Sequence, residues 1–123
     1  MPDKPMILVV DRTQRNLELL VQFLSKNGYQ TLTGASLEEF DQILAEPQKI
    51  ALALVDIGGF DCRIWRRCER LLEKQVPFFV LAHSQSATLQ QESFSHGARG
   101  VLVKPLAIQA LLGIIRSLRA ESA

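Results

Sequence analysis

The sequence predicts an α/β domain in which a parallel β-sheet is covered by helices on both faces. Strand-like runs alternate with helix-like segments five times along the 123 residues. The runs are short, continuous stretches of branched aliphatic residues, which is typical of parallel strands buried on both faces. Alternating units of this length favour crossover connections within one sheet. We therefore expect residues 1–123 to form a single domain.

The first strand and helix are marked by a change in the spacing of apolar residues. Residues 6–10 form a continuous apolar run, Met-Ile-Leu-Val-Val. Over 14–27 the apolar residues recur at steps of three and four, which predicts a helix. Its expected inner residues are Leu17, Leu20, Val21 and Leu24. The pair Asn27-Gly28 provides a typical C-terminal stop.

A second strand and helix follow directly. Residues 29–33 predict a short strand, and Ser36 with Glu39 has the capping-box spacing of a helix N-terminus. The expected apolar side of this helix consists of Phe40, Ile43 and Leu44. We expect the helix to end at Glu46-Pro47, since proline cannot continue it.

The third unit starts with the most apolar run of the chain, a strand at 51–55. A helix begins around Asp61, which is expected to serve as its N-cap. The inner residues of this helix are expected to be Ile64, Trp65, Cys68, Leu71 and Leu72. The next apolar run, 77–82, predicts the fourth strand.

The last two helices differ in how clearly they are marked. The helix expected at 86–96 is weakly apolar, with Leu89 and Phe94 as its anchors and Gly97 closing it. Residues 100–103 predict the fifth strand. The helix expected at 107–119 has a clear inner side made of Ile108, Leu111, Leu112, Ile115 and Leu118.

Three of the predicted strands end at charged residues. Asp11 follows the first strand, Asp56 follows the third, and Lys104 follows the fifth. Ligands of open α/β sheets bind beyond the carboxyl ends of the strands. We therefore expect two carboxylates and one ammonium group to converge on one edge of the sheet.

Composition excludes several classes of protein. The net charge is +1 with acids and bases interleaved, and 47% of the residues are hydrophobic. This balance argues against a polybasic protein that binds nucleic acid or a membrane surface. No apolar run approaches the roughly 20 residues that span a bilayer, and no signal peptide is visible. A cytoplasmic location is the resulting expectation.

The two cysteines, Cys62 and Cys68, lie six residues apart in a predicted helix. At about 100° per residue they point to different sides, so we expect small half-buried side chains and no disulfide. The histidines, His83 and His96, are not at ligand spacing, and a zinc site is not expected.

Four segments in order resemble the receiver domain of two-component response regulators, with the CheY-like fold. They are Ile7-Leu-Val-Val-Asp11, Ala53-Leu-Val-Asp56, Pro77-Phe-Phe-Val-Leu81 and Gly97-Ala-Arg-Gly-Val-Leu-Val-Lys104-Pro105-Leu106. The resemblance covers essentially the whole chain. It implies a flavodoxin-like three-layer sandwich with a five-stranded parallel sheet of order 2-1-3-4-5 and five helices.

The resemblance also implies a chemistry, phosphoryl transfer from a histidine to a carboxylate. By position, Asp56 is similar to the phospho-acceptor, and Lys104 to the lysine that pairs with the acceptor or its phosphate. Asp11, Asp56 and the backbone carbonyl of Gly58 correspond to oxygen ligands of a Mg²⁺ ion. The Lys104–Pro105 bond is expected to be cis.

The sequence departs from the family where the second acid after the first strand normally holds the metal. That position is Arg12. Two placements stay open for its side chain. A guanidinium inside the pocket would neutralise Asp11 and Asp56 in place of the cation. If Arg12 points outward, water would complete a weak metal site.

The residues of the family's activation switch also differ. The hydroxyl residue at the end of the fourth strand corresponds to Ala82, with Ser84 as a candidate substitute. The aromatic residue of the fifth strand corresponds to Val101. His83 takes a position where the family has a small residue and is expected to lie in a surface loop.

After the acceptor, the family's usual Met-Pro is replaced by Gly58-Gly59-Phe60, which makes this loop more flexible. Together with the altered metal ligand and switch residues, this change predicts an altered or lost switch. Self-phosphorylation on Asp56 is the most that we expect by way of enzyme activity.

Two functions remain open. The first is a receiver that is phosphorylated on Asp56, and the second is a pseudo-receiver that docks partners without phosphate. A phosphatase would need an acid at Thr13, and a flavin-binding protein would need a glycine-rich phosphate loop, so both are disfavoured.

The resemblance implies a sensor histidine kinase or phosphotransfer protein as donor and a downstream protein as target. The fourth helix, fifth strand and fifth helix would form a dimer or target face, with Arg99, Arg116 and Arg119 on a basic edge. The chain stops soon after the last helix. We therefore expect it to act by binding another protein, or to be an excised domain.

Overall fold

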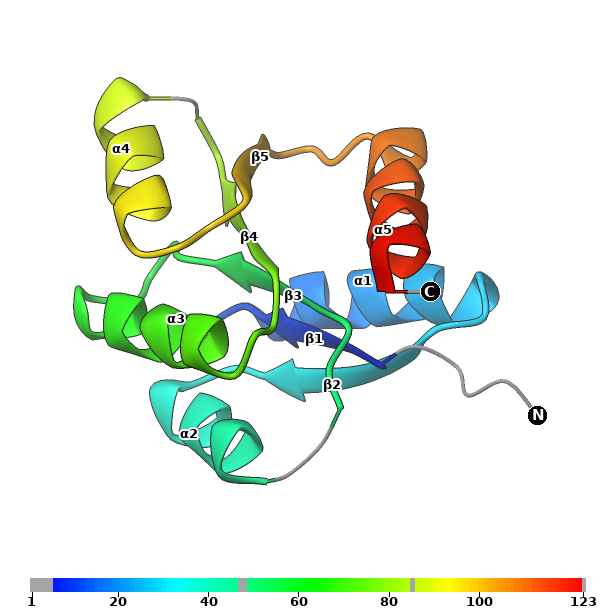
Figure 1. Ribbon diagram of the computed structural model, residues 1–123, viewed down its shortest axis with the longest axis horizontal. Coiled ribbons are helices and arrows are strands. Elements are labelled where there is room, and N and C mark those ends of the chain that lie inside the picture. Colours follow the sequence, from blue (N-terminus) through cyan, green and yellow to red (C-terminus); the bar gives the residue numbers. More distant parts are fainter. Residues whose placement is uncertain (1–5, 47–48, 85, 123) are drawn as a thin grey trace.

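The sheet has five parallel strands in the order β2-β1-β3-β4-β5, with five helices in the connections and after β5 (Figure 1). The computed structural model describes residues 6–46, 49–84 and 86–122, and the side chains of residue 108 and of 119–122 are outside its description. The strands are β1 Met6–Val10, β2 Gln30–Gly34, β3 Leu52–Asp56, β4 Phe78–Ala82 and β5 Gly100–Val103. The helices are α1 Gln14–Lys26, α2 Leu37–Ala45, α3 Arg63–Glu73, α4 Ala87–Ser95 and α5 Ile108–Ser122. The fold class, strand order and helix number expected from the sequence are confirmed.

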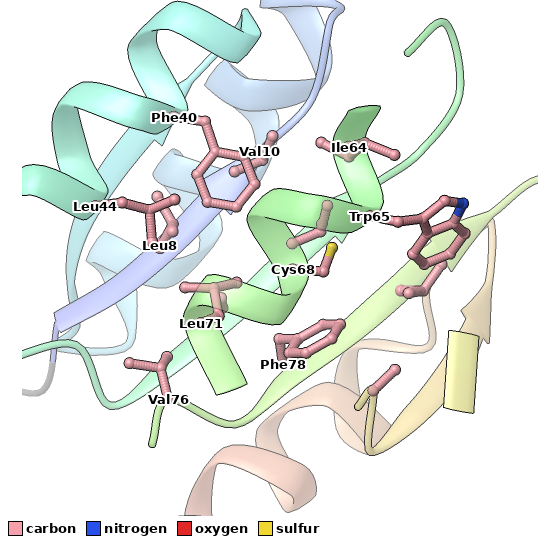
Figure 2. Packing of buried hydrophobic residues seen from close by; sticks show 14 residues of the cluster. Leu8, Val10, Phe40, Leu44, Ile64, Trp65, Cys68, Leu71, Val76 and Phe78 are labelled. Carbon is pink, nitrogen blue, oxygen red and sulfur yellow. The ribbon is translucent and has the colours of Figure 1, made fainter. Parts of the chain in front are cut away.

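Two apolar layers hold the helices on the two faces of the sheet. Alternate residues of one strand point to opposite faces, so Leu8 and Val10 pack with α2 and α3, whereas Ile7 and Val9 pack with α1 and α5. Figure 2 shows the first layer, with Phe40 and Leu44 of α2 facing the α3 side chains. Burial of both faces explains why the strands are continuous apolar runs.

Several local signals in the sequence act as expected. The Ser36 hydroxyl accepts a hydrogen bond from the Glu39 amide at 3.1 Å, and the Glu39 carboxylate accepts one from the Ala35 amide at 2.7 Å. Gly28 and Gly97 both have positive φ, +87° and +100°, and each follows the C-cap residue of its helix, α1 or α4. The expected helix end at Pro47 falls outside the described residues.

The start of α3 differs from the prediction. The N-cap is Cys62, not Asp61, and Asp61 accepts a hydrogen bond from the Arg63 amide at 2.9 Å. The Asp61 carboxylate also pairs with the Arg63 guanidinium at 2.8 Å. An aspartate carboxylate can accept a hydrogen bond from the backbone amide two residues later. The helix therefore starts one residue later than predicted, and the local hydrogen bond of Asp61 is kept.

Two residues predicted as inner anchors are exposed. Phe94 of α4 is 54% exposed, and Ser93 takes the fully buried position of that helix. Leu72 of α3 is also 54% exposed, whereas Leu71 is buried. Helical spacing alone did not predict which residue of each neighbouring pair is buried. Among the described residues, none of the helices combines the length and the apolar composition of a membrane span.

Candidate functional site

Asp11 and Asp56 lie side by side at the carboxyl edge of the sheet. Asp56 is the last residue of β3, and Asp11 directly follows β1, its neighbour in the sheet. Both are buried, with 5% of Asp11 and 2% of Asp56 exposed. The convergence expected from the strand ends is therefore present, because neighbouring parallel strands end at the same edge.

Lys104 bridges the two carboxylates. Its ammonium donates hydrogen bonds to Oδ2 of Asp11, at 3.1 Å, and to Oδ2 of Asp56. The Lys104 amide donates to the carbonyl of Ala82 at 2.8 Å, which fixes the lysine beside the end of β4. The Lys104–Pro105 peptide bond is cis, as the resemblance implied.

Backbone amides hold the remaining carboxylate oxygens. The Thr13 amide donates to Oδ1 of Asp11 at 2.8 Å, and the Gly58 amide donates to Oδ1 of Asp56 at 2.8 Å. Sequence reasoning missed these two donors. The signal that could have found them is the tendency of aspartate to bond the amide two residues on.

The pocket formed by Asp11, Asp56 and Lys104 is anionic. Burial by itself lowers the pKa of Lys104, but the hydrogen bonds from its ammonium to Asp56 and Asp11 outweigh this effect and raise the pKa above its ordinary value. Lys104 is therefore cationic at neutral pH. One ammonium against two carboxylates gives the pocket a formal charge of −1.

Arg12 takes the outward placement. One of its guanidinium nitrogens, Nη1, donates to the carbonyl of Gly59 at 3.2 Å. The guanidinium carbon lies 5.7 Å from the centroid of the Phe60 ring. Such a cation–π contact is worth about 0.5–1 kcal/mol at an exposed site. The hypothesis that Arg12 neutralises the carboxylates in this structure is wrong.

Gly58 lies against the Asp56 carboxylate. A Cβ at this position would be 3.1 Å from Oδ1 of Asp56 and 3.9 Å from Cδ2 of His83. The absence of a side chain at Gly58 therefore leaves room beside Asp56. His83 is exposed, as expected for a loop residue, and its ring is also close to Gly58.

The donor set fits a protein-bound divalent cation poorly. Both carboxylates accept from the same ammonium, and each second oxygen accepts from a backbone amide. Within the described part of the chain, no group of three acidic, histidine or cysteine side chains could hold a metal ion. Magnesium favours carboxylates together with waters, and here two carboxylates and the Gly58 carbonyl are the expected ligands.

The positions of the family switch are filled by apolar residues. Ala82 is buried, and its carbonyl accepts the hydrogen bond from the Lys104 amide. Val101 is half-buried in β5 and packs against the layer shown in Figure 2. Ser84 lies in the exposed segment after β4. A methyl group cannot donate a hydrogen bond, so Ala82 offers nothing to a phosphoryl group except its backbone.

Two surfaces adjoin the site. An apolar groove of about 370 Å³ borders Lys104; its other lining residues are Asn16, Leu19, Leu20, Phe23, Pro105, Leu106 and Leu111. A polar groove of about 400 Å³ contains Arg12 and Phe60, together with Arg63 and Arg67 of α3. On the expected basic edge, Arg99 and Arg116 are exposed, and the Arg119 side chain lies outside the description.

Comparison with known proteins agrees with this fold. The chain is 31% identical over 117 residues to the transcriptional regulatory protein GltR of Pseudomonas aeruginosa, covering 91% of the chain and 48% of that protein. The chain thus spans about half the length of this curated relative. No family model matches the sequence.

Solved structures match over nearly the whole chain. The CheY-like receiver domain from Methanospirillum hungatei has a TM-score of 0.84 at 24% identity and covers 98% of both chains. A two-component response regulator from Clostridium difficile has a TM-score of 0.83 at 19% identity and covers 95% and 97%.

A third match is a Burkholderia pseudomallei response regulator with a phosphorylated aspartic acid and a calcium ion. Its TM-score is 0.77 at 22% identity, and it covers 98% of this chain and 74% of that one. These structural matches establish the fold. Together with the sequence similarity to a transcriptional regulatory protein, they show that the chain has the fold of CheY-like response-regulator receiver domains.

Proposed function

We propose that this receiver domain accepts a phosphoryl group on Asp56 and signals through a protein partner. The observation that carries the proposal is the contact between the Asp56 carboxylate and the Lys104 ammonium at the carboxyl edge of the sheet. A carboxylate at that edge is an available nucleophile. The lysine adds the positive charge that phosphoryl transfer needs close by.

The proposed step is an in-line displacement at phosphorus. A carboxylate oxygen of Asp56 forms a bond to the phosphorus while the bond from phosphorus to the donor breaks. With a phosphohistidine donor, the electron pair of the broken P–N bond stays on the imidazole nitrogen. Lys104 neutralises charge on the phosphoryl oxygens, and Gly58 places no side chain beside Oδ1 of Asp56.

The comparisons support this proposal at the level of the family. The Burkholderia pseudomallei relative carries a phosphorylated aspartic acid. In the present chain, Asp56 occupies the end of β3 and has a lysine partner and a backbone donor. These groups supply a nucleophile, a cation and a hydrogen-bond donor for the transfer.

The test is incubation with acetyl phosphate, followed by intact-mass measurement. We expect one phosphoryl adduct per chain, absent in Asp56→Asn. Asp61→Asn is the matched control, since Asp61 is an exposed acid of the same loop whose partner is Arg63. An adduct that persists in Asp56→Asn, or is lost in Asp61→Asn, would contradict the assignment of the acceptor.

A second candidate function is docking without phosphorylation. Ala82 and Val101 favour it, because neither can make the hydrogen bond or ring rotation expected of the family switch. This candidate predicts no adduct with acetyl phosphate, with or without Mg²⁺. It also predicts that wild type and Asp56→Asn bind the same target with equal affinity.

The donor is proposed to be a histidine kinase or phosphotransfer protein, seated on the apolar groove beside Lys104. Leu19 of α1 lines this groove and is 53% exposed. A protein in the groove would lie next to the lysine that contacts Asp56. Leu19→Glu should therefore slow transfer from a phosphorylated kinase domain of the same genome and leave the reaction with acetyl phosphate unchanged. Equal slowing of both reactions would contradict this placement.

A further inference from the structure

We infer that Arg12 binds the phosphoryl group on Asp56, leaving Gly59 and Phe60 when that group arrives. The inference rests on the proposed function and adds a second cation to it. It also assigns the conformational response of the domain to the loop of Gly58, Gly59 and Phe60. In this chain, that loop would replace the switch positions Ala82 and Val101.

The first support is the position of Arg12. It follows Asp11, whose carboxylate contacts Lys104 at 3.1 Å. Its aliphatic stem lies along Gly59, where a Cβ would be 3.4 Å from Cγ of Arg12. Gly58, the next residue back, lies against Oδ1 of Asp56. Arg12 is therefore next to Asp11 in the sequence. It packs against Gly59, the neighbour of the glycine that contacts Asp56.

The second support is the charge of the pocket. Two carboxylates and one ammonium leave it at −1 before any transfer. A phosphoryl group on Asp56 would bring further negative charge and strong acceptor oxygens. Lys104 is already shared between Asp11 and Asp56. A second cation would thus be strongly attracted, and a guanidinium can bond two phosphate oxygens at once.

The third support is that the present contacts of Arg12 are weak and exposed. A guanidinium has five N–H donors, and the hydrogen bond described here uses one of them, to a carbonyl in solvent. The contact with Phe60 is a face contact at 5.7 Å. Neither buries the charge, so a phosphoryl group can compete for it.

The conformation of the loop of Gly58, Gly59 and Phe60 is expected to change when Arg12 leaves. Gly59 has φ of +81°, a conformation that L side chains rarely adopt, and it lies directly between Gly58 and Phe60. Phe60 is half-buried and packs against the α2–α3 layer, and the polar groove with Arg63 and Arg67 begins at its edge. Loss of the Arg12 contacts would free this loop and alter the groove between α2 and α3.

The test combines acetyl phosphate with chelator, because a metal and Arg12 would supply the same charge. In EDTA, we expect wild type to form the adduct and Arg12→Gln to form it about tenfold more slowly or worse. Arg12→Lys should recover only part of the rate, since an ammonium cannot bond two oxygens in a plane. Arg15→Gln, an exposed arginine at the start of α1, is the matched control and should behave as wild type.

Amide hydrogen exchange gives a second readout. The Phe60 amide donates to the carbonyl of Ile57 at 3.2 Å, so its exchange reports on the loop. Phosphorylation should change exchange over residues 58–60 in wild type. In Arg12→Gln, exchange over these residues should be fast before phosphorylation and should not change after it.

The outcomes separate the inference from the proposed function. Equal adduct rates in wild type and Arg12→Gln, with both requiring Mg²⁺, would overturn the role of Arg12 and leave Asp56 as acceptor. Arg12→Asp, which supplies a further acid, tests the acceptor itself when Mg²⁺ is present. No adduct in wild type or in Arg12→Asp under any condition would overturn the proposed function, and the role of Arg12 with it.

Discussion

The indole of Trp65 stacks on the imidazole of His96, with ring centroids 5.0 Å apart and planes 11° from parallel. His96 is the C-cap residue of α4, and its Nδ1 also lies 2.8 Å from Oε2 of Glu69. Trp65 and Glu69 belong to α3. One histidine thus joins α4 to α3 through a ring contact and a polar contact. This matters because α4 is otherwise weakly apolar.

Replacing that histidine should loosen α4. We expect His96→Ala to lower the free energy of unfolding by about 1 kcal/mol, the size of an aromatic stacking contact. The chain has one tryptophan, so the emission of Trp65 reports on the same contact and should shift to longer wavelength. Urea titration with fluorescence detection measures both. His83→Ala, at an exposed loop position, should change neither.

Ser93 offers a stabilising substitution in the same helix. Its hydroxyl is fully buried, and no hydrogen-bond partner is described for it. An unsatisfied buried hydroxyl costs about 1–3 kcal/mol. Ser93→Ala should therefore raise the melting temperature. Ser95→Ala, where the hydroxyl donates to the carbonyl of Glu92, should not raise it. A lower melting temperature for Ser93→Ala would indicate a partner for this hydroxyl.

Gly97 is expected to be intolerant of any side chain. Its φ is +100°, and a Cβ would lie 2.7 Å from Cδ2 of Leu72. Gly97→Ala should destabilise the domain by about 1–2 kcal/mol from the backbone alone. The double variant with Leu72→Ala removes the clash and keeps the backbone cost. Gly113→Ala in α5, where nothing lies within 4 Å, should stabilise by about 0.5–1 kcal/mol.

Lys104 should make stability fall at alkaline pH. Its pKa in the folded state is raised by Asp56 and Asp11 despite burial, so its stabilising effect is fully present below the pKa of an unfolded lysine. That effect is lost as the pH rises above about 10.4 and through the folded-state pKa. The difference in urea midpoint between wild type and Lys104→Gln should be constant near neutral pH and shrink above that point. A difference that grows with pH would contradict the ion pair.

The two cysteines should differ in reactivity. Cys62 is exposed, contrary to the half-buried position expected, while Cys68 is buried in the α2–α3 layer (Figure 2). Burial raises the pKa of the Cys68 thiol to about 12. The thiolate is the reactive form, so a thiol reagent at mildly alkaline pH should modify Cys62 in the native protein and Cys68 only after unfolding. Native modification of Cys62→Ser would contradict this.

The sequence by itself determined the site's three charged residues. Asp11 and Lys104 directly follow strands that are recognisable as continuous apolar runs, and Asp56 is the last residue of such a strand. Since parallel strands end at one edge, the local pattern was enough to bring these residues together. Helix caps such as Ser36 were equally predictable, because the capping hydrogen bond spans only three residues.

The inner side of a helix was predictable only where its apolar residues were numerous. In α5, Leu111, Leu112 and Ile115 are buried as expected. In α4 the few apolar residues did not decide the side, and Ser93 is buried while Phe94 is exposed. Packing of the whole helix against β5 and α3 outweighs one aromatic residue.

Only the tertiary structure decided where Arg12 points. Its sequence position beside Asp11 allowed both placements, because a long flexible side chain can reach either a carboxylate or a distant loop. The loop of Gly59 and Phe60 comes to it through the pairing of β1 with β3 and supplies a carbonyl and an aromatic face. Residues 11, 56 and 104 are fixed by the strands at whose carboxyl ends they lie, whereas the direction of residue 12 depends on partners that folding brings near it.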